Sequence, residues 1–253
     1  MDLSDVALLL GAGLAAGTAN AIAGGGSLIT FPALLAVGLP AKPANVTNSV
    51  AVSPGYLASV YGSASDLPSG RVALRTLPTA AAGTLVGCLL LVVTPAGAFQ
   101  RIVPFLVLGA ALVLAFQERL RRWVGHPRDL SPRRRMVALH TMVGLGAVYG
   151  GYFGAALGVM LVAGLGLVLD EALTRINARK NLVSATVGLM TVAVFAIVGQ
   201  VDWVAVGVLA PATLTGGYLG ARLARRLPAP VLRAIIVTFG LGVGSYLLVR
   251  AWG

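Results

Sequence analysis

The stretch NAIAGGGSLITFP, residues 20–32, places three consecutive glycines inside a long apolar run. That run, Val6 to Val37, contains 32 residues and no charged side chain. A helix crosses the hydrocarbon core of a membrane with about 20 residues, so the run is too long for one straight crossing. Glycine readily leaves the helical conformation. The stretch therefore predicts a helix break at Gly24, Gly25 and Gly26.

The composition indicates a membrane protein. Hydrophobic residues make up 57% of the 253-residue chain, charged residues make up 11%, and the mean hydropathy is +0.89. Soluble domains carry about 25% charged residues. The only cysteine, Cys88, excludes an intramolecular disulfide and a cysteine-rich metal site, and we expect no cofactor. Eight charge-poor stretches stand out: 6–37, 46–64, 77–93, 98–117, 136–169, 182–201, 203–221 and 229–249.

The chain repeats itself at an offset of 133 residues without a gap. Coincident glycines, prolines and asparagines mark shared backbone geometry, so two halves of four apolar segments each are expected to have one fold. The matching pairs are Gly11 and Gly144, Gly13 and Gly146, Gly17 and Gly150, Gly25 and Gly158, Asn48 and Asn181, Pro78 and Pro211, Gly83 and Gly216, Gly87 and Gly220, and Gly109 and Gly242.

Positive charges indicate how the halves are oriented. If all eight stretches crossed once, the basic linker 118–135 and the arginines of 222–233 would face opposite sides, against the positive-inside rule. If 6–37 and 136–169 are each re-entrant or cross twice, both basic groups become cytoplasmic. We therefore expect an all-α polytopic protein of the cell (cytoplasmic) membrane. Its inverted repeats, 1–117 and 136–253, each have a first segment broken at glycines, and both termini lie outside.

The charged residues restrict the partners. All eight carboxylates lie in loops or at segment ends, whereas a cation site or carboxylate proton relay normally needs an intramembrane Asp or Glu. The substrate is therefore expected to be anionic or neutral. Basic residues cluster in short loops, which indicates contact with anionic membrane lipid and no nucleic-acid binding. Ser27 has no neighbouring histidine, and no phosphate-binding loop or H-E-x-x-H motif occurs, so we expect no enzyme.

Polar and glycine residues cluster at matched places in the two halves, which we interpret as helix breaks or helix starts. Free N–H groups at helix starts attract anions, and amides and hydroxyls add directional hydrogen bonds. The predicted substrate-binding residues are Asn20, Gly24, Gly25, Gly26, Ser27, Thr47, Asn48, Ser49, Tyr149, Gly158, Lys180 and Asn181.

Several of these residues have another interpretation. Gly146, Gly150, Gly154 and Gly158 recur every four residues, as in a helix-packing face. Asn48 and its neighbour Ser49 could cap a helix. Lys180 and the adjacent Arg179 fit ordinary cytoplasmic charges somewhat better than direct ligation.

Four motifs carry a resemblance to a known family. The first half contains GAGLAAGTANAIAGGGSLITFPALLAVGLP at 11–40 and ANVTNSVAVSPGYLAS at 44–59, and the second contains YGGYFGAALGVML at 149–161 and RINARKNL at 175–182. Together they resemble the sulfite exporter TauE/SafE (TSUP) family of membrane permeases over nearly the whole chain.

The resemblance implies transport of a sulfur-containing or organic oxyanion such as sulfite, sulfoacetate or thiosulfate. Export is favoured over uptake, because an anion leaving a negative interior gains about 2.3 kcal/mol per charge at 100 mV. We expect alternating access at a midplane site between the repeats. A membrane scaffold or binding subunit, and an anion channel, remain alternatives. A homodimer is compatible with the sequence, which locates no interface.

Overall fold

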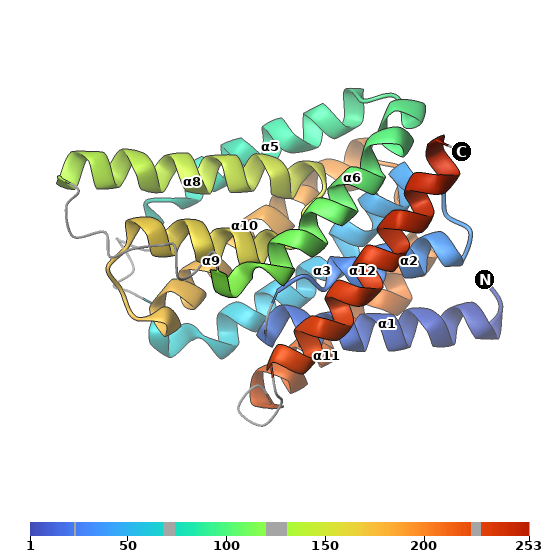
Figure 1. The fold of residues 1–253 in the computed structure, drawn as a ribbon, viewed down its shortest axis with the longest axis horizontal. Coiled ribbons are helices and arrows are strands. Elements are labelled where there is room, and N and C mark those ends of the chain that lie inside the picture. Colours follow the sequence, from blue (N-terminus) through green and yellow to red (C-terminus); the bar gives the residue numbers. More distant parts are fainter. Residues whose placement is uncertain (23, 68–73, 120–130, 224–228, 253) are drawn as a thin grey trace.

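A computed structural model describes the chain except residues 23, 68–73, 120–130, 224–228 and 253 (Figure 1). The described residues form helices and contain no strand. The first half has α1 (Leu3–Ile22), α2 (Ser27–Ala36), α3 (Ala41–Gly62), the short 3-10 helix η1 (Ala64–Asp66), α5 (Leu77–Val93) and α6 (Ala96–Ala115). The second has α8 (Pro132–Tyr152), α9 (Leu157–Val168), α10 (Leu173–Val198), α11 (Trp203–Leu223) and α12 (Ala229–Trp252).

The all-α polytopic architecture is confirmed. Within the described ranges, five helices are long and apolar enough to cross a membrane: α1, α6, α10, α11 and α12. The helices α2 and α9 have 10 and 12 residues, which is shorter than the roughly 17–25 residues of a spanning helix. Most of the predicted basic linker, 118–135, lies outside the described residues.

Both long apolar runs are broken where the backbone turns left-handed. Gly24 and Gly25 have φ angles of +79° and +90°, which end α1 before α2 begins at Ser27. In the second half, Gly154 has φ +74° and Ala156 has φ +58°, between α8 and α9. A right-handed helix cannot continue through such residues. The predicted broken first segment is therefore present in each half.

The helices of the two halves interlock. The α1 helix packs on α11, and its counterpart in the other half, α8, packs on α5. Likewise α3 packs on α11 while α10 packs on α5, and the pairs α3 with α10 and α6 with α12 lie across the centre (Figure 1). Exchanging each helix with its counterpart reproduces these contacts, as a pseudo-two-fold arrangement would. The inverted orientation and the division into 1–117 and 136–253 stay predictions.

Glycines form the two equivalent contacts between halves. A Cβ built on Gly17 of α1 would lie 2.2 Å from the carbonyl oxygen of Thr213 in α11. On the matching pair, a Cβ on Gly87 of α5 would lie 2.0 Å from the carbonyl oxygen of Val148 in α8. Only glycine allows backbones to approach this closely.

Two predicted helix starts are wrong. The α3 helix begins at Ala41, after Pro40, so Thr47, Asn48 and Ser49 lie inside it and cannot cap it. The physical reason is Lys42, whose ammonium donates to the carbonyl oxygens of Val92 (2.9 Å) and Thr94 (2.7 Å) at the end of α5. The charge is thereby accommodated within the first helical turn.

The second start is displaced in the same way. The α10 helix begins at Leu173, so Lys180 and Asn181 also lie within a helix. Lys180 and Arg179 are 6% and 7% exposed, so neither is an exposed surface charge, and their cytoplasmic location stays a prediction.

Candidate functional site

The two helix breaks meet inside the protein. A Cβ built on Gly24 would lie 3.2 Å from Cγ2 of Val159 and 3.3 Å from its backbone nitrogen. A Cβ on Gly158 would lie 3.7 Å from Cα of Gly24. Residues from the first and second halves are thus in direct contact where α1 ends and α9 begins. The missing side chains at Gly24 and Gly158 make this crossing possible.

A buried lysine lies beside the crossing. Cδ and Nζ of Lys180 are 3.2 and 3.8 Å from the position that a Cβ on Gly158 would occupy. In the described part of the chain, no hydrogen bond or ion pair engages its ammonium. Burying an unpaired charge is costly. The N-terminus of α9, which carries partial positive charge, lies at the same place, so this region favours an anion.

Arg179, the residue before Lys180, differs from it because its charge has a partner. Arg179 makes a bidentate ion pair with Glu171, with Nε and Nη2 at 2.8 and 2.7 Å from the two carboxylate oxygens. The charge of Arg179 is therefore compensated within the chain, while no described carboxylate compensates that of its neighbour Lys180.

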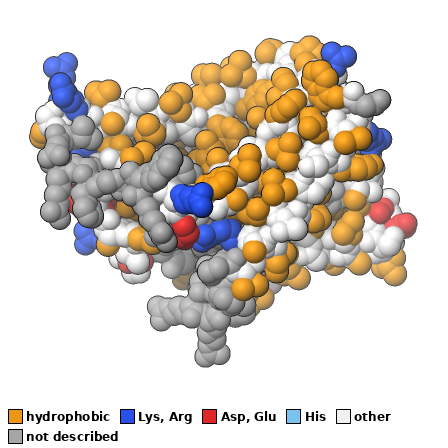
Figure 2. Space-filling view, in the orientation of Figure 1, with side chains coloured by type: hydrophobic (Ala, Val, Ile, Leu, Met, Phe, Trp, Pro, Cys, Tyr) orange, Lys and Arg blue, Asp and Glu red, His pale blue; other side chains and the backbone are white. Residues whose placement is uncertain are grey.

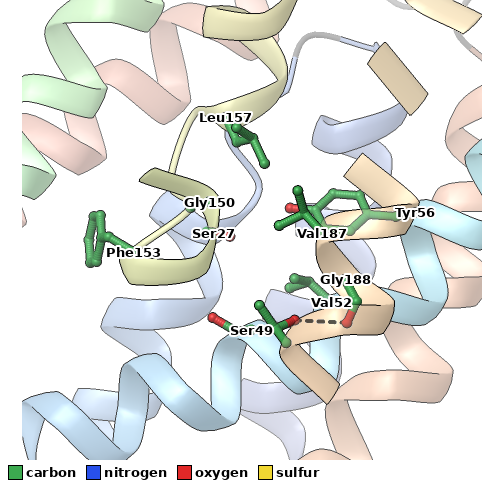
Figure 3. Close-up of a pocket in the computed structure, with 11 residues that line it drawn as sticks. Ser27, Ser49, Val52, Tyr56, Gly150, Phe153, Leu157, Val187 and Gly188 are labelled. Carbon is green, nitrogen blue, oxygen red and sulfur yellow. Dashed lines mark hydrogen bonds between the residues drawn. The ribbon is translucent and has the colours of Figure 1, made fainter. Parts of the chain in front are cut away.

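A narrow cavity adjoins the crossing (Figure 3). Its lining combines hydroxyl groups with apolar side chains. Leu157 lines it, and the next residue, Gly158, contacts Lys180. The cavity and the lysine therefore adjoin the same first turn of α9. The lining residues are Ser27, Ser49, Val52, Tyr56, Gly150, Phe153, Gly154, Leu157, Val187, Gly188 and Thr191.

The hydroxyls of the cavity are oriented by backbone carbonyls. Ser49 Oγ donates to the carbonyl oxygen of Asn45 (3.0 Å), and Thr191 Oγ1 donates to that of Gly188 (2.8 Å), the dashed line in Figure 3. Each hydroxyl oxygen keeps lone pairs and can also exchange its donor toward a ligand. No group of three or more His, Cys, Asp or Glu that could hold a metal ion occurs among the residues described.

Other predicted site residues hold the breaks in shape. Asn20 Oδ1 accepts a hydrogen bond from the backbone N–H of Gly26 (2.8 Å), and Asn48 Oδ1 accepts one from the Thr30 hydroxyl. Tyr149 donates its hydroxyl proton to the carbonyl oxygen of Ala155 (2.7 Å). These three side chains fix the ends of α1 and α8 and the position of α2.

Three residues of the predicted set face other parts of the protein than the crossing. Thr47 Oγ1 accepts from the N–H of Asp202 (3.0 Å) before α11. Asn181 Nδ2 donates to the carbonyl oxygen of Ser59 (3.1 Å) and to the Ser63 hydroxyl (2.9 Å), at the end of α3. Gly25 faces Leu114 of α6. Of the set, Gly24, Gly158 and Lys180 meet at the crossing, and Ser27 and Ser49 line the adjoining cavity.

Sequence reasoning missed Tyr56 and Thr191. Tyr56 lies seven residues after Ser49, two helical turns along the same face of α3. Thr191 follows Gly188 by three residues on α10, which again places both on one face. Tracing the face of Ser49 along α3 would have found Tyr56. Nothing in the sequence points α10 at the cavity.

Comparison with known proteins identifies the family. The model of the family described as "Sulfite exporter TauE/SafE" matches residues 9–247. A "Probable membrane transporter protein" of Haemophilus influenzae is 29% identical over 92% of this chain and 90% of its own length. "Probable membrane transporter protein ORF9" of a Sinorhizobium species is 28% identical over 96% and 92%, and YfcA of Escherichia coli K12, also called a probable membrane transporter protein, is 28% identical over 94% and 87%. No solved structure matches. With its interlocked halves and broken helices, the chain belongs to the sulfite exporter TauE/SafE family of membrane transporters.

Proposed function

We propose that this transporter carries a small sulfur-containing or organic oxyanion, such as sulfite, sulfoacetate or thiosulfate, and that it exports this anion. One observation carries the proposal: the buried, unpaired Lys180 lies beside the N-terminus of α9, where Gly24 and Gly158 meet. An ammonium and helix N–H groups are the donors that an oxyanion requires. No described carboxylate pairs with Lys180, which argues against a cation.

The proposed binding step uses both parts of the site. The anion exchanges its hydration shell for the Lys180 ammonium and the backbone N–H of Gly158, the one N–H in the first turn of α9 that has no described acceptor. The hydroxyls of Ser27, Ser49 and Thr191 line the adjoining space. The apolar wall, with Val52 and Leu157, excludes water, which strengthens the attraction to the ammonium.

The proposed transport step is alternating access. The site lies where the two halves cross, so a rocking of one half against the other would expose it to either side of the membrane. Left-handed residues on both sides of the crossing, Gly24 and Gly154, interrupt the helices at points where the chain can hinge. Export needs no coupled ion, because a dianion leaving through 100 mV gains about 4.6 kcal/mol, twice the value for one charge.

Reconstitution in proteoliposomes tests the function. Vesicles containing only this chain are loaded with labelled sulfite, thiosulfate or sulfoacetate, and efflux is followed with and without the same unlabelled anion outside. Saturable efflux that external anion accelerates is the expected result, because exchange requires a carrier. Conductance that does not saturate would indicate a channel. Absence of flux for every anion in correctly inserted protein would favour the scaffold and contradict the proposal.

A further inference from the structure

A second, larger hollow lies on the outer surface of the helices, away from the transport site. It is a groove between α2, α6 and α12. Most of its wall is apolar, with Leu35, Val103, Phe239, Val243 and Leu247 among the lining residues. Figure 2 views the face that carries α6 and α12, where hydrophobic side chains predominate.

The length of the groove along α12 matches the thickness of one membrane leaflet. Along α12 it extends from Phe239 to Arg250, and these eleven steps span about 16 Å at 1.5 Å per residue. The hydrocarbon core is about 30 Å thick, so the groove follows α12 from near the midplane to the membrane surface. Tyr246, 63% exposed, lines the groove near that surface, the usual level for interfacial tyrosine.

One cation lies at the surface end of the groove. Arg250 belongs to the last turn of α12 and is exposed. No carboxylate among the described residues pairs with it. A groove with apolar walls and one free guanidinium at its surface end is complementary to a molecule with an apolar chain and an anionic head.

At the opposite end of the α6–α12 pair, an arginine is paired with a carboxylate of the protein itself. The two helices are antiparallel, with Ala111 against Gly240, and at that end Arg233 Nη2 donates to Glu118 Oε1 at 2.9 Å. At the offset of 133 residues, Gln100 corresponds to Arg233 and Ala251 to Glu118. Both line the groove and neither is charged. The groove end therefore lacks the carboxylate that its counterpart has.

We propose that this groove binds one anionic phospholipid. An acyl chain lies along α12 between Leu247 and Phe239, and the headgroup phosphate contacts Arg250. The lipid belongs to the leaflet at the surface where α12 ends, which is the predicted outer one. This inference rests on the membrane location of α12 and does not depend on which substrate the protein transports.

Native mass spectrometry of the full-length protein in detergent tests the site. Phosphatidylglycerol and phosphatidylcholine with identical acyl chains are titrated into wild type and three variants. Arg250→Gln removes the headgroup contact, and Ala36→Trp fills the groove from an exposed lining position. Arg101→Gln is the matched control, because Arg101 is an exposed cation at the start of α6 that does not line the groove.

Wild type is expected to bind phosphatidylglycerol about fivefold more tightly than phosphatidylcholine, as one basic residue near the membrane surface provides. Arg250→Gln removes this preference, Arg101→Gln keeps it, and Ala36→Trp weakens the binding of both lipids. An unchanged preference in Arg250→Gln, or an equal loss in Arg101→Gln, overturns the proposal. So does Ala36→Trp if it converts a dimer into a monomer without changing lipid binding, because a second copy would then cover the groove.

Discussion

Lys180→Met separates the role of the buried charge from that of the fold. Methionine keeps an unbranched side chain of similar length but has no charge, so it can occupy the space beside Gly158. In the transport hypothesis the ammonium donates a charge-assisted hydrogen bond to the anion. Such bonds contribute about 1.5–3 kcal/mol, so the dissociation constant should rise about 10- to 150-fold.

The same change should not destabilise the protein without substrate. Lys180 is 6% exposed and has no described partner, so its charge is uncompensated in the unliganded state, and removing it should leave the melting temperature equal or higher. Binding is measured by isothermal titration calorimetry and stability by thermal unfolding, both in detergent. Arg175→Gln is the matched control, since Arg175 is an exposed cation on the same helix, and it should change neither quantity.

Two results would refute this reasoning in different ways. Wild-type affinity in Lys180→Met would remove Lys180 from the anion site. A lower melting temperature of the unliganded variant would show that the charge has a partner within the protein. Substitution of Gly25 is a weaker test, because its φ of +90° strains any other side chain whatever the role of the position.

Packing and pairing give two further predictions. Gly87→Ala should lower the free energy of unfolding by about 1–3 kcal/mol, because its Cβ would lie 2.0 Å from the carbonyl oxygen of Val148. Gly109→Ala, with nothing within 4 Å, should raise it by about 0.5–1 kcal/mol, and equal effects in denaturant unfolding would contradict the tight contact. Glu171→Gln should cost about 3 kcal/mol in the same assay, because it leaves Arg179 buried without its counter-charge, and an unchanged midpoint would contradict this ion pair.

The helix breaks could be predicted from the sequence because their cause is local. Glycine adopts the left-handed conformation by itself, and an offset of 133 residues repeats the pattern. The helix starts could not. Whether a lysine at the edge of an apolar stretch belongs to a loop or to a helix depends on acceptors from elsewhere, and for Lys42 these are the carbonyl oxygens of Val92 and Thr94, about 50 residues away.

The candidate site could be predicted only in part for the same reason. The sequence places polar groups near the breaks, but tertiary contacts decide which of them stay available. The amide of Asn181 donates hydrogen bonds to Ser59 and Ser63, whereas adjacent Lys180 has no described partner. Two neighbours in one motif therefore have different roles, and only the packing of α10 against α3 and α9 separates them.

The two ends of the α6–α12 pair bear on the proposed cycle. In a pseudo-two-fold protein these ends are equivalent, yet an ion pair between Arg233 and Glu118 joins one, while the groove lies at the other beside Gln100 and Ala251. Alternating access between similar halves requires a conformational asymmetry, because each half must adopt in turn the conformation of the other. The different residues at the two ends would favour one of the two conformations. If α6 and α12 exchange arrangements during transport, the groove would narrow as the ion pair separates. An anionic lipid bound at Arg250 would then stabilise the state with the open groove, so lipid binding and transport would depend on the same movement.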